Sequence, residues 1–192
     1  MQHHFSRLWH KEVRELIQSE TFDQIYRIME DSFPIIEFRS YEGQKKLLSN
    51  PYYRLLTQED EQGEVIAFLA GWEFESFRFV EHIAVSSVIR GGGRGRQLME
   101  QFMKESSLPV ILEVEPPEDE LKQRRIGFYE RLGFQLGDYN YVQPSLREDQ
   151  PELPLYIMSY PQRLTETELH SYKEQLYKEV YGVTIDEPTS FS

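Results

Sequence analysis

The spacing of hydrophobic residues changes several times along the chain, and each change predicts a different element. From Thr21 to Met29 the apolar residues recur every three or four positions, which is typical of an amphipathic helix. A second short helix is expected from Glu42 to Leu48, because Asn50 and Pro51 then stop the pattern. The N-terminal part of the chain is therefore predicted to be helical.

Strand-like segments come next. Tyr52 to Leu56 and Glu64 to Trp72 have the spacing of strands, and the acidic turn 59–63 between them suggests a hairpin. Phe77 to Val85 is again strand-like, and a glycine-rich loop follows it. Gly93 to Ser106 then carries a helical stripe of apolar residues.

The remaining segments continue this alternation of strands and helices. Val110 to Val114 is expected to form a short buried strand, and Leu121 to Leu132 a helix. Gly133 to Val142 and Leu153 to Ser159 are two further extended segments. This order predicts a mixed α/β architecture.

A C-terminal amphipathic helix is predicted after Thr165. Thr165 and Glu168 have the spacing of a capping box. One helical face is apolar, formed by Leu169, Tyr172, Leu176 and Val180. That face must pack either on the same domain or on a second subunit, so a homodimer stays open. We expect residues 1–192 to form a single domain, with a core at about 21–160 and a C-terminal helical extension at 161–192.

Composition narrows the functional classes. The chain has 192 residues and no cysteine, which excludes disulfides, a thiolate nucleophile and cysteine-ligated metals. Its net charge of -12 disfavours nucleic acid and anionic membrane surfaces as partners and favours a cationic small molecule. The alternative is that this charge only keeps the protein soluble. The longest apolar run, Val65 to Trp72, is too short to span a bilayer, and no secretory signal is visible, so a cytoplasmic location is expected.

The glycine-rich loop between the strand ending at Val85 and the next helix is suited to bind an anion. Glycines let the backbone N–H groups approach a phosphate, and the helix N-terminus adds a partial positive charge. The alternative is a flexible surface turn. The sequence fits neither a Walker loop nor a complete Gly-x-Gly-x-x-Gly motif. The residues concerned are Arg90, Gly91, Gly92, Gly93, Arg94, Gly95 and Arg96.

Two motifs together resemble the Gcn5-related N-acetyltransferase (GNAT) family. The loop 90–95 matches the family pattern Arg/Gln-x-x-Gly-x-Gly/Ala, and Phe128-Tyr129 followed by Gly133-Phe134 matches a second motif. The resemblance covers roughly Tyr52 to Ser159. It implies a central mixed sheet of about six or seven strands flanked by helices, and acetyl-CoA as cosubstrate.

The resemblance also implies where acetyl-CoA binds. The strands 79–85 and 110–114 would splay apart to admit the pantetheine arm, and the backbone of Ile83, Ala84 and Val85 would pair with its amides. The loop 90–96 would hold the pyrophosphate. One departure is Lys122, which stands where many relatives have an asparagine, so a CoA contact there is in doubt.

Acyl transfer to an amine needs an acid for the departing thiolate and a base for the amine. The family resemblance makes Tyr129 the acid, because a phenol with a pKa of about 10 can protonate a thiolate; the alternative is a packing role. Glu81 and Glu113 are the candidate bases, and strand alternation puts Glu115 on the same face as Glu113.

The remaining polar candidates lie around these residues. Glu37, between the first two helices, and Glu115 are expected to bind a cationic acceptor; the alternative for all four carboxylates is simple exposure to solvent. By alternation His82 points away from Glu81 and is expected to be a core histidine or one that supports the site indirectly. No spacing of histidines indicates a metal site.

The sequence thus predicts an N-acetyltransferase that transfers the acetyl group of acetyl-CoA directly to a primary amine of a small cationic molecule in a ternary complex. The alternative is a GNAT-like module that binds or senses acyl-CoA without turnover.

Overall fold

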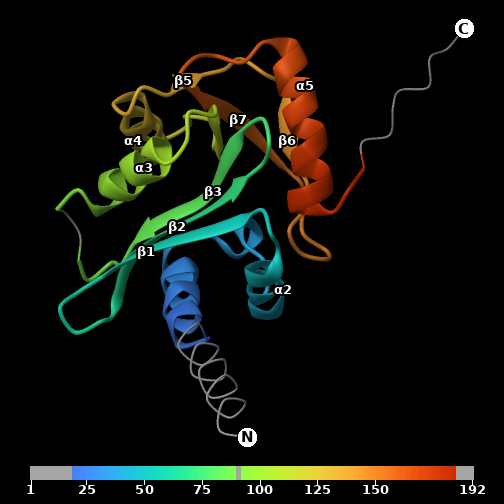
Figure 1. The fold of residues 1–192 in the computed structure, drawn as a ribbon. Helices are drawn as coiled ribbons and strands as arrows, with labels where there is room; N and C mark the ends of the chain where they lie inside the picture. Colours follow the sequence, from blue (N-terminus) through green and yellow to red (C-terminus); the bar gives the residue numbers. More distant parts are fainter. Residues whose placement is uncertain (1–18, 90–91, 185–192) are drawn as a thin grey trace, which may run out of the picture.

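A seven-stranded mixed sheet forms the centre of the computed structural model, which describes residues 19–89 and 92–184 (Figure 1). The strand order is β1-β2-β3-β4-β7-β5, and β6 also pairs with β7. All pairs are antiparallel except β3 with β4. The predicted mixed α/β class and number of strands are confirmed.

The first described segment is helical, as predicted. A helix covers residues 19–32, and a 3₁₀ turn η1 (Ile35–Glu37) follows it. Helix α2 (Tyr41–Lys46) begins at Ser40, whose side chain accepts a hydrogen bond from the Gly43 N–H, and continues into the 3₁₀ turn η2 (Leu47–Ser49). These elements cover one face of the sheet (Figure 1).

The middle of the chain has the predicted hairpin and the strand, loop, helix and strand that follow it. Strands β1 (Tyr53–Glu59) and β2 (Val65–Glu73) form the hairpin. A short turn then joins β2 to β3 (Arg78–Val85), which pairs with it antiparallel. Helix α3 (Arg94–Lys104) follows the glycine loop, and strand β4 is Val110–Val114.

The C-terminal third contains helix α4 (Glu120–Glu130), strands β5 (Gln135–Leu136), β6 (Tyr141–Gln143) and β7 (Leu153–Tyr160), and helix α5 (Glu166–Gln175). The expected extended segment 133–142 is therefore broken into two short strands. Helix α5 begins with the predicted capping box and ends in a π-helical turn, η3 (Leu176–Tyr181).

Apolar side chains fill both faces of the sheet. On one face α3 and α4 bury Leu98, Phe102, Ile126 and Tyr129 against β2, β3 and β4. On the other face two clusters lie under the N-terminal helices and under α5. The C-terminal helix α5 contributes Tyr172 to the cluster that also contains Phe77.

The apolar stripe of the C-terminal helix packs on its own sheet. Tyr172 stacks on Phe77 with ring centroids 4.1 Å apart, and Leu176 and Val180 are buried in the same cluster. Of the two partners considered for this stripe, the structure therefore shows the domain itself. This packing accounts for the stripe without a second subunit.

A β-bulge in β3 corrects one prediction. Opposite β2, Ala70 pairs with His82 but Gly71 pairs with Val80, so Glu81 is the extra residue. Val80 and Ile83 consequently both pack on the α3 and α4 side, although they are three residues apart. Glu81 and His82 therefore share the opposite face, contrary to the simple alternation that we expected.

The pairing of β3 with β4 stops early. It includes Arg78 to Val80 on β3 and Val110 to Leu112 on β4, and it does not continue toward Val85. The following backbone of β3 has lost its parallel partner, as expected for strands that separate. The two clefts of the candidate site open beside this part of β3, where it separates from β4.

Candidate active site

A cleft of about 380 Å³ opens beside the free edge of β3. The predicted pantetheine stretch, Ile83 to Val85, forms one wall, and the loop and helix start at Gly93 to Arg96 form another. The remaining wall comes from α4, through Arg125, Phe128 and Tyr129. The structure thus brings the described residues of the predicted CoA site together; Arg90 and Gly91 lie outside the described residues.

The glycine loop has a backbone conformation that favours glycine. Gly92 and Gly93 have φ values of 72° and 67°, which residues with a side chain rarely adopt. Gly93 is the N-cap of α3 and offers no side-chain cap, so the N–H groups of the first helical turn stay available. Arg94 and Arg96 are exposed beside them, and Arg96 pairs with Glu100 at 2.7 Å.

A second cleft, of about 410 Å³, lies where β3 and β4 separate. It shares Ile83 to Val85, Arg125 and Tyr129 with the first cleft, so the two clefts adjoin each other. Five carboxylates line it, and they include all four predicted acidic site residues: Asp31, Glu37, Glu81, Glu113 and Glu115.

Tyr129 stands at the junction of the two clefts. It projects from α4, and only 7% of the residue is exposed. Burial raises the pKa of Tyr129 to about 12, while Arg125 acts in the opposite direction. The hydroxyl therefore keeps its proton at neutral pH, which is the form that a general acid needs.

Glu81 is fixed in a buried ion pair. Its Oε1 is 2.5 Å from Arg39 Nη1, its Oε2 accepts a 2.8 Å hydrogen bond from Trp72 Nε1, and its side chain is 3% exposed. Burial would raise the pKa of Glu81, but the charges of Arg39 and His82 and the two hydrogen bonds outweigh it and hold this pKa below its ordinary value.

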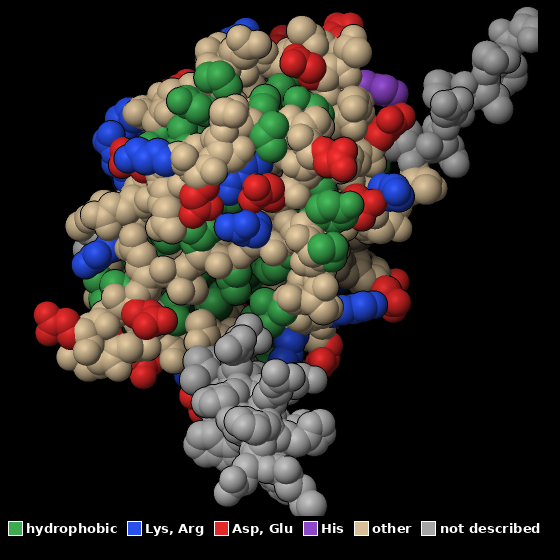
Figure 2. All heavy atoms as spheres, viewed as in Figure 1, with side chains coloured by type: hydrophobic (Ala, Val, Ile, Leu, Met, Phe, Trp, Pro, Cys, Tyr) green, Lys and Arg blue, Asp and Glu red, His purple; other side chains and the backbone are tan. Residues whose placement is uncertain are grey.

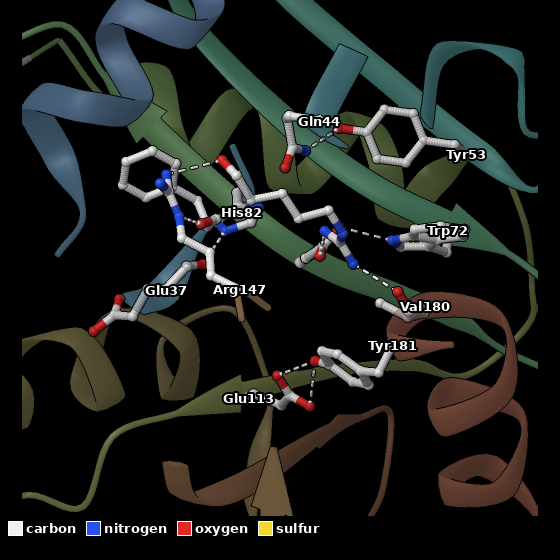
Figure 3. Close-up of polar contacts among 12 residues, drawn as sticks. Glu37, Gln44, Tyr53, Trp72, His82, Glu113, Arg147, Val180 and Tyr181 are labelled. Carbon is white, nitrogen blue, oxygen red and sulfur yellow. Dashed lines mark hydrogen bonds and ion pairs between the residues drawn. The ribbon is translucent and has the colours of Figure 1, made fainter. Parts of the chain in front are cut away.

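Glu113 has a different environment, although it lies only one strand away. Tyr181 Oη is 2.7 and 2.9 Å from its two carboxylate oxygens (Figure 3). The Tyr141 hydroxyl donates to Oε1. No basic side chain in the described ranges 19–89 and 92–184 forms an ion pair with it. Burial raises the pKa of Glu113 to about 7, although both tyrosine hydrogen bonds lower it.

Glu115 and Glu37 lie at the other end of the same cleft. Glu115 pairs with Arg125 at 2.7 Å and with Lys122 at 3.6 Å, both on α4. Burial and the charge of Glu115 raise the pKa of Glu37, while Arg125 and Lys122 lower it. Lys122, the position that departs from the family pattern, thus forms an ion pair with Glu115 in this cleft.

Sequence comparisons agree with this geometry. A sequence model of the acetyltransferase (GNAT) domain matches residues 51–136. A Bacillus subtilis (strain 168) protein named "Putative acetyltransferase YjbC" is 30% identical over 162 residues, which is 81% of this chain and 80% of the relative.

The chain belongs to the GNAT acetyltransferase family.

Solved structures show the same fold. A Bacteroides thetaiotaomicron protein described as a "Putative acetyltransferase from GNAT family" superposes with a TM-score of 0.78 at 29% identity, over 90% of this chain and 96% of the other. An aminoglycoside 6'-N-acetyltransferase complexed with coenzyme A has a TM-score of 0.57 at 16% identity, over 76% of this chain and 93% of the other. This chain is therefore an acyltransferase, and its GNAT relatives use acetyl-CoA.

The GNAT site also contains residues that the sequence did not single out. They include Arg39, which neutralises Glu81, and Tyr141 and Tyr181, which hold Glu113. They come from three segments far apart in the sequence, and none belongs to a motif. Only the fold brings them to the carboxylates.

One wall of the second cleft is held through its backbone carbonyls. The carbonyl oxygen of Glu37 contacts His82 Nε2 at 2.8 Å. Arg147 donates from Nε to the Phe38 carbonyl at 2.8 Å and from Nη2 to the Arg39 carbonyl at 3.1 Å (Figure 3). Residues 37–39 are therefore fixed beside the cleft.

Two further properties concern the described residues. No group of three His, Cys, Asp or Glu side chains among them is placed to hold a metal ion. No helix in the described ranges has the length and apolar character that crossing a membrane demands. Figure 2 shows acidic and basic side chains interspersed on one face, so the net negative charge is not gathered into one uniform patch there.

Proposed function

We propose that this GNAT enzyme transfers the acetyl group of acetyl-CoA to a primary amine of a small cationic molecule, by direct attack in a ternary complex. The observation that supports this proposal most strongly is that the two clefts adjoin each other. They share Tyr129 and the free edge of β3, so a thioester in one cleft would meet an amine in the other.

The first cleft suits acetyl-CoA. Its pyrophosphate would bind the N–H groups at the start of α3, with Arg94 and Arg96 nearby, as anions bind at helix N-termini. The pantetheine amides would pair with the β3 backbone from Ile83 to Val85, which has no parallel partner at this point. The thioester would then lie close to Tyr129.

The second cleft suits an ammonium group. Glu81 is neutralised by Arg39, and Glu115 by Arg125. Within residues 19–89 and 92–184, the lining carboxylates Asp31, Glu37 and Glu113 form no such ion pair. A cation entering there would gain electrostatic attraction in a partly desolvated site. A primary amine carries this charge at neutral pH, because its pKa is about 10.

Glu113 is the general base in this proposal. A base must accept the proton of the bound ammonium so that the neutral nitrogen can attack, and a pKa near the working pH serves this best. Burial raises the pKa of Glu113 to about 7, whereas Arg39 holds the pKa of Glu81 low. Glu81 instead fixes Arg39, and both residues shape the cleft.

The proton balance closes with Tyr129. The neutral amine attacks the thioester carbonyl and the C–N bond forms. The nitrogen of the tetrahedral intermediate then loses its second proton to solvent, and the C–S bond breaks as the intermediate collapses to the amide. The Tyr129 hydroxyl gives its proton to the departing thiolate, so free CoA leaves as a thiol. The proton taken by Glu113 and the one lost by Tyr129 exchange with solvent before the next turnover.

The proposal is tested by incubating the protein with acetyl-CoA and a panel of diamines, amino sugars and amino acids. Thiol release and mass spectrometry of the acetylated product measure turnover. We expect cationic primary amines to be acetylated, and initial-rate lines for the two substrates to intersect, as in a ternary complex. Parallel lines, or turnover restricted to anionic amines, would contradict the proposal.

Tyr129→Phe is the matched variant for the acid. It keeps the buried ring and removes the hydroxyl, so acetyl-CoA should still bind in calorimetry while turnover falls. Unchanged turnover would show that Tyr129 has only a packing role.

A further inference from the structure

The π-helical turn at the end of the C-terminal helix reaches the acceptor cleft. Its last two residues make two different contacts there. The Val180 carbonyl accepts a 2.6 Å hydrogen bond from Arg39 Nη2, and the Tyr181 hydroxyl lies 2.7 and 2.9 Å from the Glu113 oxygens (Figure 3). One turn of helix therefore contacts the partner of Glu81 and also Glu113 itself.

The turn is held firmly on both sides of these contacts. Leu176 and Val180 are buried among the apolar residues under α5. Gly182 adopts φ 69° and ends the turn, and the Val183 N–H then bonds to the Tyr177 carbonyl at 2.8 Å. π-helical turns are uncommon and often occur at functional sites. Here the turn places the Val180 carbonyl on Arg39, the partner of Glu81, and the Tyr181 hydroxyl on Glu113.

Two tyrosine hydroxyls on one carboxylate favour its ionised form. A hydrogen bond to a charged group is stronger than one between neutral groups, so each hydroxyl opposes the penalty of burying Glu113. Tyr141 reaches Glu113 from β6 and Tyr181 reaches it from the C-terminal turn. The charges that also act on the pKa of Glu113 are those of Glu81, which raises it, and Arg39, which lowers it.

We propose that Tyr181 is a positioning residue of this acetyltransferase, which keeps the Glu113 carboxylate oriented and ionised for the acceptor amine. This inference rests on the proposed role of Glu113 as the base. Tyr181 lies far from both family motifs in the sequence, in the segment that we had considered a C-terminal extension. The active site thus includes the end of the described chain.

The test is the pH dependence of kcat/KM for Tyr181→Phe, with Tyr177→Phe as the matched control. Tyr177 lies in the same turn, but its hydroxyl donates to the Val142 carbonyl and not to Glu113. Losing one hydrogen bond to a charged group should move the acidic limb of Tyr181→Phe upward by about one to two pH units, at little cost to acetyl-CoA affinity. The limb of Tyr177→Phe should stay at the wild-type pH.

A second readout does not depend on activity. In protein carrying ¹³C-labelled glutamate, the side-chain carboxyl resonance of Glu113, assigned by its loss in Glu113→Gln, reports its titration directly. It should titrate at higher pH in Tyr181→Phe than in wild type. A resonance and a kinetic limb that both stay in place would overturn the inference.

The outcomes separate this inference from the proposed function. If Glu113→Gln keeps the acidic limb, Glu113 is not the base, and the inference fails with it. If Glu113→Gln removes the limb but Tyr181→Phe leaves it unmoved, the inference alone fails. Should Tyr181→Phe not fold, 3,5-difluorotyrosine at position 181 keeps the ring and donates a stronger hydrogen bond. The limb should then move to lower pH, and an unmoved limb would again overturn the inference.

Discussion

The two clefts that meet at Tyr129 are built in different ways. The cleft proposed for the cofactor is formed mainly by two stretches close in sequence, Ile83 to Val85 and Gly93 to Arg96, whose backbone groups would hold acetyl-CoA in our proposal. The cleft proposed for the acceptor is lined by residues from seven helices and strands and from the loops between them, and its carboxylates are held by contacts with Arg39, Trp72 and two tyrosines. The first cleft depends on glycines at particular positions of one loop. The second forms only when the whole chain has folded and brought distant residues together.

This difference has a consequence for robustness. A backbone site tolerates most side-chain changes around it and fails when a side chain or a charge enters the loop. A buried side-chain network responds to the loss of any member, because a buried charge without its partner is costly. Substitutions in the two clefts should therefore differ in kind, and four experiments test this.

The largest effect is expected from Arg39→Leu. This change leaves the Glu81 carboxylate buried without its cation, which should lower the free energy of unfolding by about 3–5 kcal/mol. Chemical denaturation measures it. The double variant Arg39→Leu/Glu81→Gln removes the unpaired charge and should recover much of the loss. A single variant as stable as wild type would show that this ion pair is not a structural requirement.

The next effect concerns stability and pH at Glu113. Its pKa rises from 4.5 to about 7 on folding, so both states are protonated below pH 4.5 and the folded state is increasingly penalised as pH rises toward 7. The penalty above pH 7 is up to about 3 kcal/mol. Glu113→Gln should therefore gain stability over wild type between pH 5 and pH 8 in urea unfolding. A difference that is the same at both pH values would contradict the raised pKa.

The same variant should lose activity. Without the base, kcat/KM at neutral pH should fall about 100-fold or more, because general base catalysis contributes a factor of that order. Acetyl-CoA affinity in calorimetry should stay unchanged, since Glu113 does not line the cofactor cleft. A parallel loss of acetyl-CoA binding would mean that the two clefts are not separable.

The smallest effect, and the one aimed at the cofactor cleft, is expected from Gly95→Asp. A side chain at Gly95 would meet Val85, Phe128 and Ile83 at ordinary contact distances of 3.7–4.0 Å, and an acidic residue in the first helical turn is favourable for α3. The variant should fold normally, yet bind acetyl-CoA about tenfold or more weakly through repulsion of the pyrophosphate. Gly95→Ala should bind as wild type. If Asp and Ala bind equally, the pyrophosphate lies elsewhere.

Much of the fold could be predicted from local pattern. The hairpin, strand 110–114 and the Thr165 capping box depend on residues close in sequence, and the structure confirms all three. The bulge at Glu81 could not be predicted, because it depends on how β3 pairs with β2. The break between β5 and β6 depends in the same way on pairing with β7.

The candidate site shows the same difference between residues in local motifs and residues that depend on long-range contacts. Glycines 92 and 93 and Tyr129 belong to motifs, and the structure places them on the cofactor cleft or next to it. The sequence also named Glu81 and Glu113, but it could not rank them, because Arg39 and Tyr181 are 42 and 68 residues away from the carboxylates that they contact. Their opposite pKa shifts follow from these long-range contacts.

A crystal structure with CoA bound tests the meeting of the two clefts at Tyr129 most directly. The account predicts that the pyrophosphate lies against the N–H groups from Gly93 to Arg96, with the CoA sulfur in hydrogen-bonding reach of the Tyr129 hydroxyl and facing Glu113 across the acceptor cleft. A sulfur that ends away from Tyr129, or a pyrophosphate bound away from the start of α3, would contradict it.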